Sequence, residues 1–415
     1  MPPVRTPVLV GLGVSLTTMA TSTFATLSLG ALAPYVRAAF RFSTFEVGLL
    51  PALVFAGALV ASVPAGHLTD RLGAGPALVV SQLGIAAGIG LAALTSSRGW
   101  FLTGVWIAGL GYGAVNPATN VLSTSLVPRN RRALFLSVKQ TGVPLGGLIA
   151  GATLPRLADS LGWRAALAVA VGVLLFTSLV GLWVARREAL GWFEQLALPR
   201  SDASPTPAPG VLVPGGISTA LFGFVMSGVQ YSLAGYLTVY LVDEHGFSKP
   251  TSGLALSVAF GAACLGRVIW GWLSDRCFAS HASTLVFASA GSLTALVAFT
   301  TGVSGPSLWL VIMVIGICSI GWNGVYMALI IDRATAGRLG QATGRGLLFI
   351  YGGVVVLPPL LGVLNDATGS WSTMWAAATG AVLLAGGALA LSPRRLVGAG
   401  SSEATRTEPK VGFPA

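Results

Sequence analysis

The sequence predicts an all-α membrane protein of twelve transmembrane helices, arranged as two pseudo-symmetric six-helix bundles. Its composition is the first reason: of 415 residues, 54% are hydrophobic and only 9% are charged, whereas soluble domains carry roughly a quarter charged residues. The apolar residues also lie in long runs, and a helix needs about 20 such residues to cross a hydrocarbon core. An internal repeat, described below, is the third reason. This composition excludes an ordinary soluble enzyme, a disordered protein and a disulfide scaffold.

Polar, proline-rich and glycine-rich segments divide the chain into twelve candidate spans. Their approximate cores are 8–34, 46–67, 77–95, 100–126, 134–155, 165–185, 216–241, 251–273, 284–302, 307–331, 342–364 and 373–391. The first run is too long for a signal-peptide core, so we expect it to be retained. Residues 186–215 contain Ser-Pro-Thr-Pro-Ala-Pro-Gly and no continuous apolar run. They predict a cytoplasmic linker between an N-terminal bundle at 1–185 and a C-terminal bundle at 216–391, followed by a cytoplasmic tail at 392–415.

The distribution of basic residues favours one orientation. With both termini in the cytoplasm, sixteen of the 24 Lys and Arg residues lie on the cytoplasmic side and six on the other side, as the positive-inside rule requires. The net charge of +11 is scattered through short loops and forms no patch for nucleic acid. We therefore expect a multi-pass protein of a bacterial cytoplasmic (inner) membrane, with lipids as its surroundings. The two remaining basic residues, Lys139 and Arg267, fall inside predicted spans.

The two predicted halves repeat each other. A shift of 205 positions superposes the first two spans on the seventh and eighth, and a shift of 207 pairs Asn116 with Asn323. Identities at the first shift include Gly30/Gly235, Tyr35/Tyr240, Phe42/Phe247, Ser43/Ser248, Gly48/Gly253, Leu49/Leu254, Gly66/Gly271, Leu68/Leu273, Asp70/Asp275 and Arg71/Arg276. Parallel halves of this kind are typical of one class of secondary transporters, whose substrate site lies near the midplane between the halves.

Two short segments carry a family resemblance. Gly66-His-Leu-Thr-Asp70-Arg71-Leu-Gly73 resembles the signature loop of the major facilitator superfamily, and Gly271-Trp-Leu-Ser-Asp275-Arg276 is its counterpart in the second half. The resemblance covers residues 8–391. It implies a transporter, expected to be monomeric, that works by rocker-switch alternating access.

These loop residues are candidates for conformational gating. An Asp at this turn can cap a helix N-terminus or pair with a neighbouring Arg, and so stabilise a closed cytoplasmic side. The glycines allow backbones to approach closely in lipid. The alternative is a solvated loop that serves insertion only.

Arg267 is the leading candidate for substrate binding. None of the thirteen acidic residues sits in the middle of a span, and charges at membrane depth are costly and usually functional. Arg267 precedes Asp275 by eight residues, which places it roughly 12 Å from the cytoplasmic turn, near the midplane. A guanidinium offers a planar fork that matches a carboxylate. The segment Gly266-Arg267-Val-Ile-Trp-Gly271 also resembles span eight of the monocarboxylate porters and oxalate/formate exchangers, which implies carboxylate binding. The alternative role for Arg267 is structural, with its guanidinium bound to the free carbonyl groups at a helix end.

Lys139 lies five residues beyond Leu134, roughly 8 Å into the fifth span. It can face the cavity, or its flexible stem can reach toward the headgroups. Lysine, unlike arginine, can lose its proton in a desolvated site, so Lys139 is also a candidate for proton coupling.

Uncharged polar residues supply the rest of the predicted site. Tyr112, Asn116 and Asn120 are spaced by four and share one helix face. The other candidates are Gln140, Gln230, Tyr231, Trp322, Asn323 and Tyr326. Each of them alone is also consistent with interhelical packing.

The predicted function is transport of a small organic anion, mono- or dicarboxylate-like, by proton symport or anion exchange. We expect no enzyme, cofactor or metal, because no catalytic constellation appears and the three cysteines have no metal-ligand spacing. The alternative is proton-linked efflux of lipophilic drugs or metabolites. It is disfavoured because Ile107 stands where such exporters carry an arginine in span four. A nitrate porter is a further alternative through Arg267, but Ser62 stands where that group has a second arginine.

Overall fold

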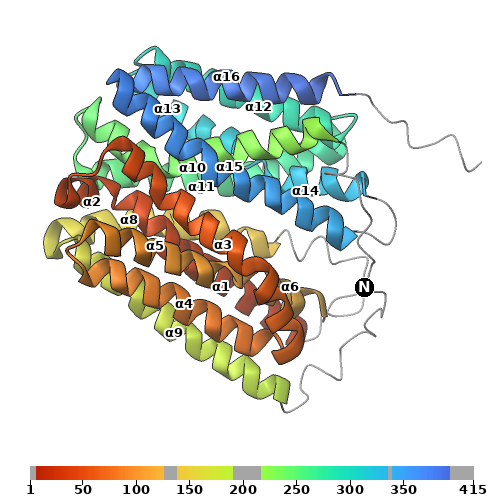
Figure 1. The fold of residues 1–415 in the computed structure, drawn as a ribbon. Coiled ribbons are helices and arrows are strands. Elements are labelled where there is room, and N and C mark those ends of the chain that lie inside the picture. Colours follow the sequence, from red (N-terminus) through yellow and green to blue (C-terminus); the bar gives the residue numbers. More distant parts are fainter. Residues whose placement is uncertain (1–5, 126–137, 190–215, 335–338, 393–415) are drawn as a thin grey trace, which may run out of the picture.

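A computed structural model describes residues 6–125, 138–189, 216–334 and 339–392. Most of the predicted linker and nearly all of the predicted tail lie outside these residues. The first half contains α1 (Thr6–Ala31), α2 (Ala33–Phe40), α3 (Thr44–Leu72), α4 (Ala74–Leu94), α5 (Arg98–Gly113), α6 (Val115–Ser125), α8 (Gly142–Leu161) and α9 (Trp163–Ala189). The second half contains α10 (Ile217–Asp243), α11 (Lys249–Arg276), α12 (His281–Thr300), α13 (Pro306–Ile315), η3 (Gly316–Ile320), α14 (Asn323–Asp332), α15 (Leu339–Thr368) and α16 (Trp371–Ala390). Figure 1 shows each half as a bundle of roughly aligned helices.

Most of these helices have the length and composition of membrane spans. In the described part of the chain, ten helical stretches are long and apolar enough to cross a membrane. The predicted fourth span corresponds to α5 followed by α6, and α8 overlaps the predicted fifth span but extends six residues beyond it. The protein is therefore a helical multi-span protein, and the count of twelve stays a prediction.

The predicted fourth and tenth spans are both interrupted. The fourth breaks at Ala114, three residues before Pro117, which has no N–H to continue the helical ladder. The tenth contains the π-helical turn η3, a distortion that is frequent at functional sites. The interruptions occupy repeat-related places, and Asn116 and Asn323 lie just beyond them. Each half thus presents a distorted helix followed by an asparagine at a repeat-related position.

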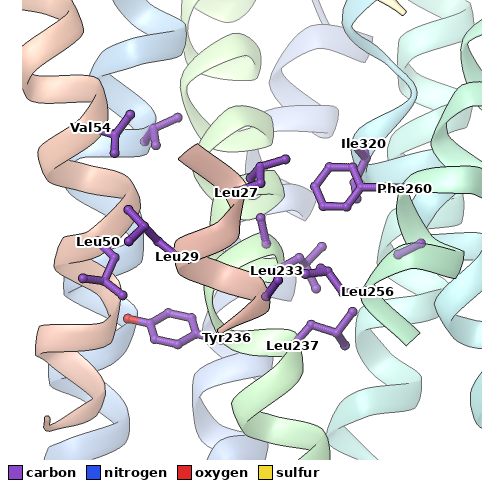
Figure 2. Close-up of a cluster of buried hydrophobic side chains, with 14 of the residues drawn as sticks. Leu27, Leu29, Leu50, Val54, Leu233, Tyr236, Leu237, Leu256, Phe260 and Ile320 are labelled. Carbon is purple, nitrogen blue, oxygen red and sulfur yellow. The ribbon is translucent and has the colours of Figure 1, made fainter. Parts of the chain in front are cut away.

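The two halves pack tightly over part of their length. Figure 2 shows Leu27 and Leu29 of α1 and Leu50 and Val54 of α3 gathered with Leu233, Tyr236 and Leu237 of α10 and Leu256 and Phe260 of α11. At Gly30, an added Cβ would lie 2.1 Å from the carbonyl oxygen of Ala234, and at Gly253 it would lie 2.3 Å from Pro155. Only glycine allows these approaches.

Among the described residues, the contacts between the halves named above lie in the middle of the bundle and toward one end. We call this end, where α2 lies in Figure 1, the Asp366 end, and the opposite end, with α6 and α14, the Asp70 end. At the Asp70 end, a Cβ on Gly66 or Gly271 would meet nothing within 4 Å. Around these two glycines, therefore, no described residue of the other half lies close in this state.

Candidate functional site

Arg267 lies at the boundary between the halves. Its guanidinium, on α11, donates a hydrogen bond to the main-chain carbonyl of Gln140 in the other half. Its Nε is buried and has no hydrogen-bond partner. Tyr112 and Tyr231 lie close enough to interact with it electrostatically. Because a buried donor without an acceptor is costly, this arginine has capacity for a further acceptor.

Lys139 is fully buried in the first half. Its Nζ lies 2.6 Å from Oδ1 of Asn120, 3.0 Å from Oγ1 of Thr119 and 3.5 Å from Oδ1 of Asn116. An ammonium group has three donors and no acceptor, so three neutral oxygens of α6 match it. The side chain does not extend to the surface. Thr119 was not predicted, although it shares the helix face of Asn116 and Asn120.

An aromatic cluster connects the two cations across the halves. The ring of Phe55 lies 4.4 Å from Tyr231, 5.1 Å from Tyr351 and 5.8 Å from Tyr112, between centroids. Phe55 and Tyr112 belong to α3 and α5, whereas Tyr231 and Tyr351 belong to α10 and α15. Nδ2 of Asn116 donates to the Tyr351 hydroxyl at 3.2 Å. The predicted residues Lys139, Asn116, Tyr112, Tyr231 and Arg267 therefore belong to one central region.

Phe55 and Tyr351 were missed by the sequence analysis. A phenylalanine in an apolar run does not indicate a binding site, because the same sequence context occurs when the side chain packs in a core. Tyr351 is a single tyrosine in the predicted eleventh span, which is a weak signal at best.

The remaining predicted residues form a separate group inside the second half. Oε1 of Gln230 accepts hydrogen bonds from Nε1 of Trp322 at 3.1 Å and from Nδ2 of Asn323 at 2.8 Å. Tyr326 is fully buried and donates to the carbonyl of Thr219 at 3.2 Å. These bonds hold α10 to α14.

The centre of the described protein is cationic. Every Asp and Glu in the described residues lies in a loop or in the first or last turn of a helix. No group of three or more His, Cys, Asp or Glu residues that could hold a metal ion occurs in that same part of the chain. Lys139 and Arg267 thus have no carboxylate partner among the described residues, and an anion placed between them would meet one buried and one half-buried cation.

The Asp366 end is closed by hydrogen bonds between the halves. The Asp366 carboxylate accepts from the main-chain N–H groups of Thr44 and Phe45, each at 2.8 Å. The Thr44 hydroxyl donates to Oδ1 of Asn365, and the Tyr236 hydroxyl is shared between the carbonyls of Pro358 at 2.6 Å and Thr44 at 3.1 Å. A helix N-terminus has free N–H donors and a partial positive charge. The first turn of α3 is therefore capped by a carboxylate of the other half, a contact that we call the Asp366 cap.

Comparison with known proteins identifies the family. The model of the Major Facilitator Superfamily matches residues 14–345 and 219–412. The chain belongs to the major facilitator superfamily. It is 24% identical over 383 residues to the hexuronate transporter of Bacillus subtilis (strain 168), covering 86% of each chain. It is 25% identical over 391 residues to human monocarboxylate transporter 11, covering 90% of this chain and 80% of that one.

The fold of this superfamily member is also similar to that of solved transporter structures. A crystal structure of a bacterial homologue of the human lysosomal transporter Spinster superposes with a TM-score of 0.71 at 16% sequence identity. The match covers 91% of this chain and 95% of the other. The family prediction made from the two signature loops is thus confirmed.

The signature loops of this superfamily member are exposed in the present state. Asp70, Arg71, Asp275 and Arg276 are all exposed, and within the described residues their side chains make no hydrogen bond or ion pair. Gly73 has φ +88° and joins α3 to α4, a conformation that L side chains rarely adopt. The loop turn therefore needs glycine at position 73, whereas Gly66 and Gly271 lie in open surroundings.

Proposed function

We propose that this superfamily member is a secondary transporter of a small organic anion, with twelve spans and both termini in the cytoplasm of a bacterial cell. The observation that carries the proposal is Arg267, placed between the halves with a buried, unpartnered Nε and no carboxylate nearby in the described part of the chain. The relatives named for hexuronate and monocarboxylate support an organic anion. Mono- and dicarboxylates both fit the chemistry of this arginine.

Arg267 would bind the carboxylate of the substrate. A guanidinium stays charged at physiological pH and can donate two parallel hydrogen bonds to one carboxylate. The aromatic cluster of Phe55, Tyr112, Tyr231 and Tyr351 would contact the body of the substrate. Because these rings come from both halves, a bound anion would contact both halves at once, as alternating access requires.

The transport cycle would alternate between two closed ends. In this proposal the present state is closed at the Asp366 end, which would be the outer face, and open at the Asp70 end, which would face the cytoplasm. Rocking of the halves would break the Asp366 cap and bring the signature loops of Asp70 and Asp275 into contact with the opposite bundle.

Coupling would be proton symport or anion exchange. With no carboxylate in the described centre, a proton could travel on the substrate or on Lys139, and exchange would need no proton at all. Proton-linked efflux of lipophilic compounds is the second candidate, and the ring cluster around Phe55 favours it. The absence of buried carboxylates from the described residues, and Ile107 in span four, speak against it.

Uptake into proteoliposomes tests the proposal. Labelled lactate, benzoate, succinate and glucuronate are offered with and without an imposed pH gradient. We expect uptake of at least one carboxylate, and we expect Arg267→Ala and Arg267→Lys to reduce it about 100-fold, as losing a partner of a buried charge costs several kcal/mol.

The matched control is Arg156→Lys, because Arg156 also bonds a main-chain carbonyl, that of Ala152, but is exposed. It should transport at the parental rate. Parental uptake by Arg267→Lys, or transport of lipophilic cations in place of all four anions, contradicts the proposal.

A further inference from the structure

Asn116 is held in one orientation by its two partners. Its Oδ1 faces Nζ of Lys139, while its Nδ2 donates to the Tyr351 hydroxyl across the boundary between the halves. A protonated lysine has no acceptor, so the amide must offer its oxygen to Lys139 and its N–H₂ to Tyr351. The charge on Lys139 therefore decides whether the Tyr351 hydroxyl faces the N–H₂ group or the oxygen of the Asn116 amide.

The orientation of Asn116 decides what the Tyr351 hydroxyl can do. A hydroxyl has one donor and two acceptor lone pairs. Here it accepts from Asn116, so its own O–H remains available to donate elsewhere. The Tyr351 ring packs on Phe55 beside Tyr231, and Tyr231 lies close to Arg267. That free donor belongs to the same central region as the guanidinium.

We propose that Tyr351 is a substrate-binding residue whose hydroxyl donates to the bound anion, and that Asn116 is a positioning residue that links this donor to the protonation of Lys139. The inference rests on the proposed function, because it takes Arg267 as the anion site. It adds a binding residue from the second half and a route by which a proton in one half affects an anion held by the other.

The switch follows from donor and acceptor counts. When Lys139 releases its proton to water as the halves move, the amine keeps two N–H donors, which can donate to Thr119 and Asn120. Asn116 is then free to turn its oxygen toward Tyr351, whose O–H donates to the amide and no longer to the anion. Anion affinity falls, so proton and anion binding reinforce each other, as linkage requires.

Few other titratable groups face Lys139. Helices α1 and α6 carry no charged side chain in their described residues, and on α9 the basic and acidic residues lie in its terminal turns. Elsewhere in the central region, α11 carries Arg267 and Cys264, α15 carries Tyr351 and α5 carries Tyr112, while the titratable groups of α3 beyond its first turn lie near its C-terminal end, at His67, Asp70 and Arg71. The carboxylates named here lie at helix ends, so none of them belongs to the central region where it could carry the proton in place of Lys139.

Equilibrium binding tests the inference with purified protein and the same four labelled probes, lactate, benzoate, succinate and glucuronate, across a range of pH. The parental protein should bind its best probe more tightly as pH falls. Tyr351→Phe keeps the ring and removes the hydroxyl. It should weaken binding at low pH by about tenfold, the size expected for a lost hydrogen bond to a charged group, and should remove most of the pH dependence.

Asn116→Asp provides the second variant. Its carboxylate accepts from both Lys139 and Tyr351, so binding should be weak at every pH, and combining it with Tyr351→Phe should add little. Tyr240→Phe is the control, because Tyr240 is a buried tyrosine of the second half that bonds to His245 and Phe299. Unchanged melting temperatures show that the variants fold.

The outcomes separate this inference from the proposed function. If Arg267→Lys abolishes binding while Tyr351→Phe retains full affinity and full pH dependence, Tyr351 is not a binding residue and the inference is overturned. If Tyr351→Phe weakens binding equally at every pH, the link through Asn116 is overturned. Failure of the parental protein to bind any of the four probes overturns the proposed function itself.

Discussion

Lys139 and Arg267 are both basic, but only one of them can exchange a proton at ordinary pH. Arg267 keeps its charge and offers a planar fork, whereas Lys139 is an amine held by three neutral oxygens. A buried ammonium without a counter-ion is costly, and a nearby anion offsets that cost. Proton uptake by Lys139 and anion entry at Arg267 are therefore expected to assist each other.

Lys139→Arg tests this division of roles. The variant fixes a positive charge at position 139, so net uptake of a monoanion should lose its rise with falling external pH, while exchange of one anion for another continues. Uptake and exchange in proteoliposomes at several pH values measure both. Lys249→Arg, at the N-terminus of α11 beside the Tyr35 ring, is the control. A full pH response in Lys139→Arg would show that the substrate or another group carries the proton.

At this scale the sequence located the charges but not their partners. A lysine and an arginine in apolar spans are conspicuous because so few charges occur there. Phe55 and Tyr351 are not conspicuous in the sequence, because aromatic residues are common in membrane spans both in packed cores and in binding sites. Gln230, Trp322 and Asn323 were predicted individually, and only the structure shows that they bond to one another. Whether any of the predicted residues contacts substrate stays a prediction.

Helix α3 illustrates how single elements hold a conformational state. Its first turn needs acceptors for its free N–H groups, and Ser43 serves one of them through a capping box with Glu46. The Asp366 cap serves two more from the other half. The repeat-related helix α11 has Pro250 in its first turn, which has no N–H to offer. Asp159, 207 positions before Asp366, bonds instead to Tyr35 of its own half at 3.5 Å. The closure is therefore asymmetric.

Asp366→Asn should weaken closure of the Asp366 end. The amide loses the charge that favours a helix N-terminus and one of the two acceptors. Because Asp366 is exposed, we expect a loss of about 1 kcal/mol, which shifts the equilibrium between open and closed ends about fivefold. Distances between spin labels at Ser97 and Glu244, both exposed in loops at this end, report the shift. Asp159→Asn, the matched control, should leave them unchanged; equal distances in all three proteins would contradict the role of the cap.

The sequence predicted the positions of the helices but not the interruptions within them. Apolar runs indicated the spans, and the structure follows most of them within a few residues. The apolar runs predict continuous helices for spans four and ten, whereas α5–α6 breaks at Ala114 and the tenth span contains η3. Pro117 was a local signal for the first break. No proline marks the π-helical turn at Gly316–Ile320 in the same way.

The whole molecule is a pair of related bundles that meet differently at their two ends. The repeat and the paired signature loops predicted the family, because both are local patterns that survive in the sequence. The conformational state was not predictable from the sequence. Two states of one chain differ by only a few kcal/mol, and the balance depends on contacts between halves, such as the Asp366 cap, that no local pattern reveals.

The signature loops are expected to act in the opposite state. Asp70 and Asp275 are exposed here and lie far from the centre, so Asp70→Asn or Asp275→Asn should slow turnover, by about tenfold if each loop contact contributes about 1.4 kcal/mol, with little change in equilibrium binding. Initial uptake rates and probe binding measure the two quantities. Glu244→Gln, an exposed acidic loop residue at the other end, is the control. Lost binding with normal turnover would contradict the gating role.

Counterflow of a labelled carboxylate tests the central claim most directly, because it depends on a binding site that both sides reach in turn and on no net driving force. Proteoliposomes loaded with an unlabelled carboxylate from the panel are diluted into a trace of the same labelled compound. The parental protein should accumulate label transiently above equilibrium, and Arg267→Lys, which keeps the charge but not the planar fork, should not. A parental overshoot in Arg267→Lys would contradict the claim that this arginine holds the transported anion.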